Sequence, residues 1–362
     1  MSEVGLALDA VETPFLWTDL ALLEQNIHSL ATHFQSAGVN WRPHTKGIKT
    51  PAIAHKLLDA GAIGVTCAKL GEAEVMVAAG IHDILVANQV VGPQKITRLV
   101  HLCRNADVKV VADNSGVVAA TGAAAAEIGV TVGMLVEVNT GMNRAGVAPG
   151  EATVALAKQM ATTKGVRLAG LMTWEGHMLS EPDPERRRQG IEDAIGQLNA
   201  TAEQCRAAGL TVDIVSAGGS GTYQVTPFLP GVTEIEAGGA IFCDMTYQGW
   251  GVDLAPALFV RAMVTSRPAP DRIICDAGFK TLPRGYATPL AVGVEHIDKV
   301  SFSAEHGILT LSQPNDTLQV GDTVDFIVGY GDATVFLHDH LYGVRQGVVE
   351  SVWPVLARGK LR

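Results

Sequence analysis

Short apolar runs alternate with longer amphipathic segments from about Val39 to Gly238. The short runs are rich in β-branched residues, as buried parallel strands are. They span residues 39–45, 63–68, 83–88, 108–113, 133–138, 168–174, 213–218 and 233–238. The segments between them carry apolar residues at helical spacing and end in Gly. Eight strand-then-helix units predict a (β/α)8 barrel. A doubly wound open sheet is the alternative, but no GxGxxG motif follows the first strand.

The pattern changes after about Leu254. Short β-branched runs there are separated by Pro, Gly, Asp and Asn, which is typical of antiparallel strands. We therefore expect an α/β protein with a TIM-type (β/α)8 barrel over residues 21–253. A mostly antiparallel β domain over 254–362 follows it, and residues 1–20 are expected to add a strand to that domain.

Composition and charge narrow the partners. The chain has 362 residues, 47% of them hydrophobic, which suits one large barrel and a smaller domain. Its net charge of −10, without a Lys/Arg-rich run, argues against a nucleic-acid partner. No apolar run reaches the ~18 residues needed to span a bilayer, and no secretory signal is visible, so we expect a cytoplasmic protein away from membranes. Five cysteines without CxxC spacing indicate reduced, buried thiols.

Barrel enzymes carry their chemistry at the carboxyl ends of the strands. The first predicted strand ends at Lys46, where a low-dielectric setting would let the amine form a Schiff base. An ordinary exposed lysine is the alternative. Arg144 lies in a Gly-flanked turn after the fifth strand, and Trp174 and His177 follow the sixth.

A glycine-rich segment follows the seventh predicted strand. It comprises Gly219, Ser220, Gly221 and Thr222, and its backbone N–H groups could hold a phosphate, although a plain loop is the alternative. The pair 238–239 after the eighth strand could complete the same site. A lysine, an arginine and a phosphate loop together suit pyridoxal phosphate.

Five segments give the chain a family resemblance. They are RPHTKGIKTPAIA at 42–54, NTGMNRAGV at 139–147, SAGGSGT at 216–222, EHG at 305–307 and VESVWPVLARGK at 349–360. They resemble the D-threonine aldolase, 3-hydroxy-D-aspartate aldolase and D-serine dehydratase family of fold type III pyridoxal-phosphate enzymes, related through the barrel to alanine racemase. The resemblance runs from about Thr13 to Lys360. It implies a homodimer in which the β domain of one subunit covers the barrel of the other.

The resemblance also implies roles for individual residues. Lys46 matches the Schiff-base lysine, and Arg144 matches the arginine that hydrogen-bonds the phenolic oxygen of the cofactor. Trp174 lies where relatives often carry a tyrosine beside the pyridine ring, and His177 matches a histidine near the β-hydroxyl of the substrate. The expected cofactor site comprises His44, Lys46, Arg144, Trp174, Gly219, Ser220, Gly221, Thr222, Gly238 and Gly239.

The chain departs from the family at a metal site. Aldolase relatives carry His-Cys-Asp ahead of the last β segment, and the His and Asp bind a divalent metal. Alignment by the shared ending puts Tyr330 at the histidine and Asp332 at the aspartate. A lone carboxylate is a poor site for a transition metal, so Asp332 is expected to hold, at most, a hard ion such as Mg²⁺ or Mn²⁺ with waters. His338 and His340 are alternative ligands if their segment is a strand.

These observations predict an enzyme acting on a small amino acid. The leading hypothesis is a lyase that performs retro-aldol cleavage of a β-hydroxy-D-amino acid to glycine, or a substituted glycine, and an aldehyde. Lys46 and His177 would be its catalytic residues. One alternative is an amino-acid racemase or epimerase that uses Lys46 and Tyr330. The others are a β-hydroxy-D-amino-acid dehydratase and a non-catalytic pyridoxal-phosphate carrier, and the predicted β domain argues against a carrier.

Overall fold

The computed structural model describes residues 3–362, which form two compact units. The barrel unit comprises Leu30–Lys46, Ile53–Gly238 and Lys360–Arg362. The β unit comprises the chain up to Ser29 together with Gly47–Ala52 and Gly239–Gly359. Each unit is thus assembled from separate stretches, whereas the predicted limits of 21–253 and 254–362 divide the chain linearly.

Eight parallel strands form the sheet of the barrel unit. They are β2 (Asn40–Trp41), β3 (Val65–Cys67), β4 (Asp83–Gln89), β5 (Asp107–Ala112), β6 (Val132–Glu137), β7 (Val166–Met172), β8 (Ile214–Ala217) and β9 (Glu234–Ile235). Their order is β2-β9-β8-β7-β6-β5-β4-β3. The two ends of this order meet at a parallel bridge between His44 and Thr66, where Thr66 N–H donates to the Pro43 carbonyl at 2.9 Å. The predicted barrel and its eight strands are confirmed.

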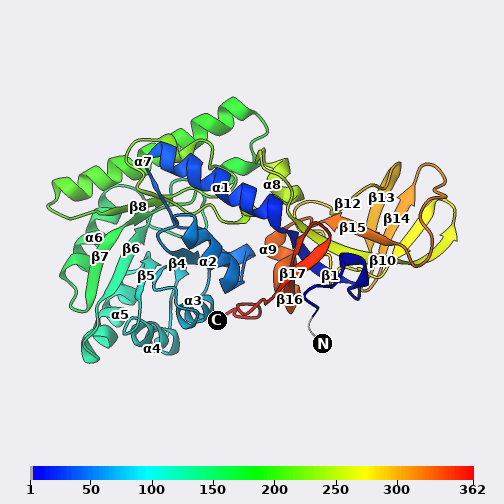
Figure 1. Ribbon diagram of the computed structural model, residues 1–362. Coiled ribbons are helices and arrows are strands. Elements are labelled where there is room, and N and C mark those ends of the chain that lie inside the picture. The colour runs from blue at the N-terminus through cyan, green and yellow to red at the C-terminus, as the bar shows by residue number, and fades with distance from the viewer. Residues whose placement is uncertain (1–2) are drawn as a thin grey trace. The chain divides into compact units, whose positions relative to one another are not determined.

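Helices follow the strands and lie outside the sheet (Figure 1). Those that begin in the barrel unit are α3 (Leu70–Ala78), α4 (Pro93–Leu102), α5 (Ser115–Glu127), α6 (Glu151–Thr162) and α7 (Pro184–Ala207). Two more run from the β unit into the barrel unit, α1 (Leu20–Ala37) and α2 (Pro51–Asp59). Local sequence sets the helix ends: Asn114 caps α5 by accepting from the Gly116 N–H at 2.9 Å, and Asp183 followed by Pro184 begins α7.

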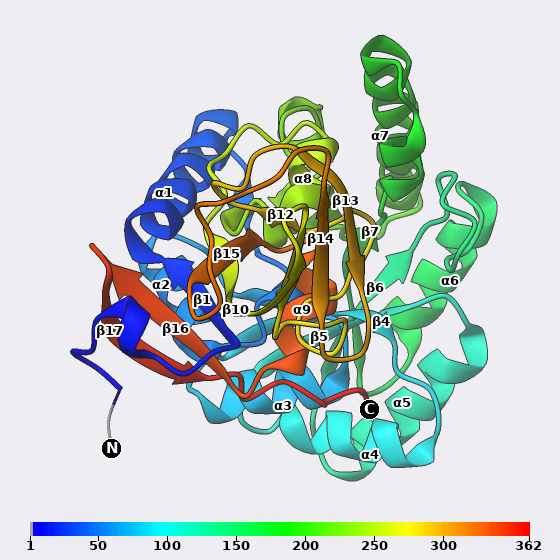
Figure 2. The ribbon, with the colours of Figure 1, turned by 90° about the vertical axis from the view of Figure 1, so that its right-hand side faces the viewer.

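The β unit contains a nine-stranded sheet (Figure 2). Its strands are β1 (Phe15–Asp19), β10 (Leu258–Ala269), β11 (Arg272–Cys275), β12 (Leu290–Ala291), β13 (Ile297–Phe302), β14 (Gly307–Leu311), β15 (Thr323–Ile327), β16 (His340–Arg345) and β17 (Val348–Pro354). Strand β1 lies between β10, antiparallel, and β16, parallel. The Trp17 ring stacks on Phe259 at 4.6 Å between ring centroids in the core beside β1. The antiparallel domain is therefore confirmed, and β1 adds an N-terminal strand to its sheet.

Two short helices complete the β unit, α8 (Met245–Gly249) and α9 (Gly331–Thr334). No helix within residues 3–362 combines the length and the apolar character that crossing a membrane requires.

An ion cluster joins four barrel strands toward their amino-terminal ends, because Asp83 and Glu234 are the first residues of β4 and β9. The Arg42 side chain is 2% exposed, with its Nε 3.0 Å from Glu234 Oε2 and its Nη1 2.7 Å from Asp83 Oδ1. Lys109 Nζ lies 2.7 Å from the same Asp83 oxygen. Removing one partner would leave a buried charge uncompensated, which typically costs about 3–5 kcal/mol. The cluster therefore holds Arg42, directly after β2, to β4 and β9.

Glu236 is a second buried carboxyl in the barrel, directly after β9. Its Oε1 accepts a hydrogen bond from Ser216 Oγ at 2.9 Å. Burial first, and the neighbouring Glu234 carboxylate second, raise its pKa to about 8, although Ser216, Arg42 and Lys46 act in the opposite direction. Glu236 therefore keeps its proton near neutral pH.

Gly170 is the point where β7 approaches β8 most closely, and it provides a test of barrel packing. A Cβ added at Gly170 would collide with the Ile214 carbonyl, whereas one added at Gly196 in α7 would meet nothing within 4 Å. We expect Gly170→Ala to lower the free energy of unfolding by about 1–3 kcal/mol through overpacking. Gly196→Ala, the control, should raise it by up to about 1 kcal/mol through helix propensity. Chemical denaturation measures both, and equal effects would contradict this packing.

Glu236 predicts a pH dependence of stability. Its pKa is about 8 in the folded chain against an ordinary 4.5, so the folded state binds the extra proton between these values. This contribution to stability is complete below about pH 4.5 and is lost as the pH rises toward about 8. Glu236→Gln cannot ionise, so its stability relative to wild type should rise with pH by about 1 kcal/mol per unit in that window. Urea unfolding at pH 5 and pH 8 tests this, and a pH-independent difference would be the contrary result.

Candidate active site

Lys46 lies on a short 3-10 turn, Thr45–Gly47, at the carboxyl end of the β2 segment. Regular strand ends at Trp41, but the backbone stays paired beyond it, because His44 N–H donates to the Glu236 carbonyl at 3.0 Å. Thr45 is buried and donates to the Thr66 carbonyl at 3.0 Å, and the Lys46 N–H donates to His44 Nδ1 at 3.2 Å. Both sides of the barrel closure therefore hold the turn that presents the half-buried Lys46 side chain.

The glycine-rich loop after β8 is anchored by a carboxylate that the sequence did not single out. Glu175 is fully buried, and its Oε1 accepts from Thr222 Oγ1 at 2.7 Å and from Thr226 Oγ1 at 2.6 Å. Its Oε2 accepts from the Gly218 N–H at 3.2 Å. Thr222 Oγ1 in turn accepts from the Gly219 N–H at 3.2 Å. One carboxylate thus holds the loop at both ends, Gly218 and Thr222. The Thr222 hydroxyl uses its proton in the hydrogen bond to Glu175.

Close packing explains why this region needs glycine. A Cβ on Gly219 would come within 2.6 Å of the Trp174 ring, and one on Gly221 within 2.5 Å of Leu179. One on Gly238 would collide with the His44 backbone. Gly239 belongs to the β unit, where a Cβ would collide with Tyr247. These contacts bring Trp174 over the loop, while phosphate binding by its amides stays a prediction.

Arg144 lies on the turn that follows β6. Asn139 Oδ1 shapes this turn by accepting from the Gly141 and Asn143 N–H groups at 3.2 and 2.9 Å. The Arg144 side chain is 54% exposed, and its Nη2 lies 3.9 Å from Glu137 Oε1. Burial raises the pKa of Glu137, while a hydrogen bond from Gln89 and the charge of Arg144 lower it. Such a long ion pair leaves the guanidinium able to meet a second anionic group.

His177 contacts the same turn. It lies in the 3-10 segment Gly176–Ser180, and its Nε2 would come within 2.6 Å of a Cβ on Gly141, which has a φ of +132°. Its Nδ1 is buried and has no hydrogen-bond partner within residues 3–362. A buried polar atom left unsatisfied costs about 1–3 kcal/mol. A ligand hydroxyl beside His177 would remove that cost.

Tyr330 and Asp332 form a hydrogen-bonded pair in the β unit. Tyr330 lies directly before α9, and Asp332 lies within it. Tyr330 Oη donates to Asp332 Oδ2 at 2.9 Å. Burial and then the negative charge of Asp332 raise the pKa of the Tyr330 hydroxyl. A Cβ on Gly47 would collide with the Asp332 carboxylate, so this carboxylate packs against the residue that follows Lys46 in the chain.

Asp244 binds the backbone between Tyr330 and Asp332, and it is another residue that the sequence did not identify. Its Oδ2 accepts from the Gly331 N–H at 2.6 Å, and its Oδ1 accepts from the Thr246 and Tyr247 N–H groups at 3.0 Å each. The pKa of Asp244 is raised to about 7, and burial is the largest cause. The available signal was an aspartate directly before a short polar stretch, which is typical of a helix N-cap.

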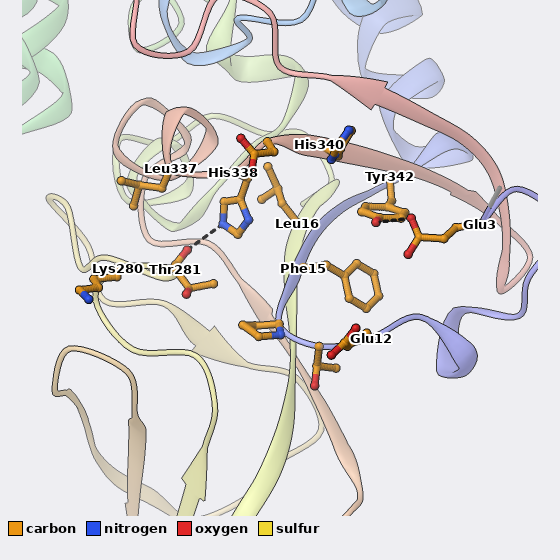
Figure 3. A pocket seen from close by; sticks show the side chains of 13 residues that line it. Glu3, Glu12, Phe15, Leu16, Lys280, Thr281, Leu337, His338, His340 and Tyr342 are labelled. Carbon is orange, nitrogen blue, oxygen red and sulfur yellow. Dashed lines mark hydrogen bonds between the residues drawn. The ribbon is translucent and has the colours of Figure 1, made fainter. Parts of the chain in front are cut away.

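The alternative metal ligands do not join Asp332. His338 precedes β16 instead of lying in it, and its Nε2 lies 2.9 Å from the Thr281 carbonyl. Figure 3 shows His338 directed at Thr281 in a cavity of about 410 Å³ that His340 also lines and Asp332 does not. Within residues 3–362, no three His, Cys, Asp or Glu side chains gather as metal ligands. The alternative in which His338 and His340 replace the lost ligand requires both residues to lie in one strand. His338 lies outside β16, so this alternative is wrong.

The cysteines take no part in this site. None of the five forms a disulfide, and four are buried. Burial raises the pKa of Cys275 to about 12 and that of Cys243 to about 11, so both thiols stay protonated. Four of the five thiols are thus buried as expected, and their reduced state stays a prediction.

The sequence matches two family models and is similar to known proteins along nearly its whole length. The family model "Alanine racemase, N-terminal domain" matches residues 18–246, and "Putative serine dehydratase domain" matches 257–344. A D-threonine aldolase from Arthrobacter sp. is 35% identical, covering 99% of this chain and 96% of the relative. A 3-hydroxy-D-aspartate aldolase from Paracoccus denitrificans (strain Pd 1222) is 33% identical, covering 98% of this chain and 94% of the relative.

A solved structure agrees with these matches. The crystal structure of D-threonine aldolase from Filomicrobium marinum superposes with a TM-score of 0.96 at 34% identity, covering 100% of both chains. Sequence and fold thus agree along the whole length. The chain belongs to the D-threonine aldolase and 3-hydroxy-D-aspartate aldolase family, built on the alanine racemase-like barrel.

Proposed function

We propose that this protein is a pyridoxal-phosphate-dependent lyase that cleaves the Cα–Cβ bond of a β-hydroxy-D-amino acid. The products are an aldehyde and glycine, or a substituted glycine. The observation that carries the proposal is the full-length match, in sequence and fold, to proteins named as aldolases of such substrates. A cytoplasmic homodimer remains a prediction from the sequence and the family resemblance.

The residues of the barrel unit suit the cofactor. Lys46 offers an amine at a strand end, and Arg144 has a half-exposed guanidinium with only a long ion pair to Glu137. The loop after β8 is held by Glu175, and Trp174 packs on it. The buried Nδ1 of His177 needs a partner that residues 3–362 do not provide. Lys46 would hold the cofactor aldehyde, Arg144 its ring oxygen, and residues 219–222 its phosphate.

The chain's own residues then act around the substrate. When bound, the cofactor accepts the electron pair released at Cα. The His177 imidazole would accept the proton of the β-hydroxyl, which starts the cleavage. The Lys46 amine would return a proton to Cα. The neutral Glu236 carboxyl keeps a further negative charge away from Lys46.

Aldehyde release tests this function. Purified enzyme supplied with pyridoxal phosphate, with and without divalent metals, should release aldehyde from at least one of D-threonine, D-phenylserine and 3-hydroxy-D-aspartate. Lys46→Ala should abolish the release, because the amine that holds the cofactor is gone. Borohydride reduction and peptide mass analysis should place the pyridoxyl group on Lys46 in the wild type.

Three other outcomes would contradict the aldolase function. Exchange of the Cα proton in D₂O with inversion and without aldehyde would identify a racemase or epimerase. Formation of a 2-oxo acid and ammonia would identify a dehydratase. Absence of any turnover with the cofactor bound would leave a carrier.

Glu175→Gln tests whether the anchored loop holds the cofactor phosphate. The amide would place an N–H₂ group against donors that now bond to Glu175. The loss of one such bond costs about 1–3 kcal/mol, so we expect the Kd for pyridoxal phosphate to rise about tenfold or more. Titration of the cofactor-free protein, followed by absorbance, measures this.

Glu203→Gln is the matched control, because Glu203 is 72% exposed on α7 and pairs with Arg206 at the surface. It should leave the Kd within about twofold of wild type, since exposed ion pairs contribute little. An unchanged Kd in Glu175→Gln would show that the loop does not depend on this carboxylate.

A further inference from the structure

The family resemblance implies a divalent metal at the position of the Tyr330–Asp332 pair. The side chains at this position differ from the metal ligands that the resemblance implies. A phenol hydroxyl replaces the imidazole, and it is used as a donor, because Tyr330 Oη gives its hydrogen bond to Asp332 Oδ2 at 2.9 Å. Divalent cations need several ligands that offer lone pairs, and transition metals favour imidazole over a neutral phenol. Tyr330 therefore blocks one side of Asp332 instead of extending a ligand set.

The nearest further carboxylate cannot complete a site. Asp244 is fully buried, and three backbone N–H groups, those of Gly331, Thr246 and Tyr247, bond to its two oxygens. Turning it toward a metal would break the N-cap of α8 and the bond that fixes the start of α9. Asp244 thus serves the backbone and holds the Tyr330–Asp332 segment in place.

Aromatic rings surround the Tyr330 ring. Its centroid lies 5.2 Å from that of Tyr286, 6.0 Å from that of Tyr247 and 6.3 Å from that of Trp250. These edge-to-face contacts are favourable and favour the orientation in which the hydroxyl meets Asp332. A rigid ring keeps its hydroxyl on Asp332, and apolar edges near this position cannot replace the water ligands that a hard ion would need.

We propose that this enzyme needs no divalent metal, because the Tyr330–Asp332 pair takes the place of the family's metal site and offers its hydroxyl and carboxylate as hydrogen-bonding groups for the substrate hydroxyl. The role toward the substrate rests on the proposed function. The absence of a metal site depends only on the side chains around Asp332. Contact of Asp332 with Gly47 places the pair against the residue that follows Lys46.

Direct metal binding tests the first half without any activity assay. Calorimetric titration of the holoenzyme with Mn²⁺ should show no saturable binding up to millimolar metal. Tyr330→His, which restores an imidazole two residues before Asp332, should create a site with one Mn²⁺ per chain. Adding Asp332→Asn to that variant should remove the site, which shows that the pair forms it. Saturable binding of one Mn²⁺ to the wild type would overturn the proposal.

Aldehyde release under chelation tests the second half. Wild type should change less than about twofold between EDTA and added Mn²⁺, whereas Tyr330→His should depend on Mn²⁺ by about tenfold or more. Tyr330→Phe loses the hydroxyl without gaining a ligand, so its kcat should fall in a way that Mn²⁺ does not restore. Loss of wild-type activity in EDTA with recovery in Mn²⁺ would overturn metal independence. A wild type that never releases aldehyde would defeat the aldolase function, and the titration would still decide whether a metal binds.

Discussion

The closure of the barrel beside Lys46 is the constraint on which the candidate site depends. A lysine that must meet a cofactor at a fixed point cannot sit on a mobile loop, and here its segment continues the β2 pairing through His44 to Thr66. Arg42 lies two residues before His44 and forms ion pairs with Glu234 and Asp83. Lys109 also pairs with Asp83, so four strands share one ion cluster. This cluster holds Arg42 among the strands, and the hydrogen bonds of His44 and Thr45 hold the turn that carries Lys46.

Buried carboxyl groups have three different uses in this chain. Glu175 is an acceptor that arranges a loop, Glu236 is a neutral group beside charged neighbours, and Asp244 is an acceptor for backbone N–H groups at two short helices. Their environments separate these roles, because donors stabilise an ionised carboxylate and desolvation favours the protonated form. The −10 net charge therefore does not describe the interior, where each acidic group is matched to its own donors.

Sequence pattern predicted the barrel strands because their apolar runs have a local cause, burial on both faces of a parallel sheet. It also singled out Lys46, Arg144 and His177 as candidates, because strand ends are where barrel chemistry lies. Glu175, Glu236 and Asp244 could not be assigned in the same way. For Glu175 and Glu236 nothing local distinguishes a buried carboxylate from a solvated one, since their donors Thr226 and Ser216 lie 51 and 20 residues away. Asp244 has the local signal of a helix N-cap, but its bond from Gly331 spans 87 residues.

Position 330 shows how a substitution and its surroundings must agree. Alignment alone identifies a histidine replaced by tyrosine and suggests a damaged metal site. In the folded chain the tyrosine is hydrogen-bonded to the remaining aspartate, enclosed by three aromatic rings and held by the backbone bond from Gly331 to Asp244. Tyr330 gives Asp332 Oδ2 a defined donor in this half-buried place. The hydrogen bond to Asp332 and the ring contacts of Tyr330 are what a site adapted to work without a cation requires.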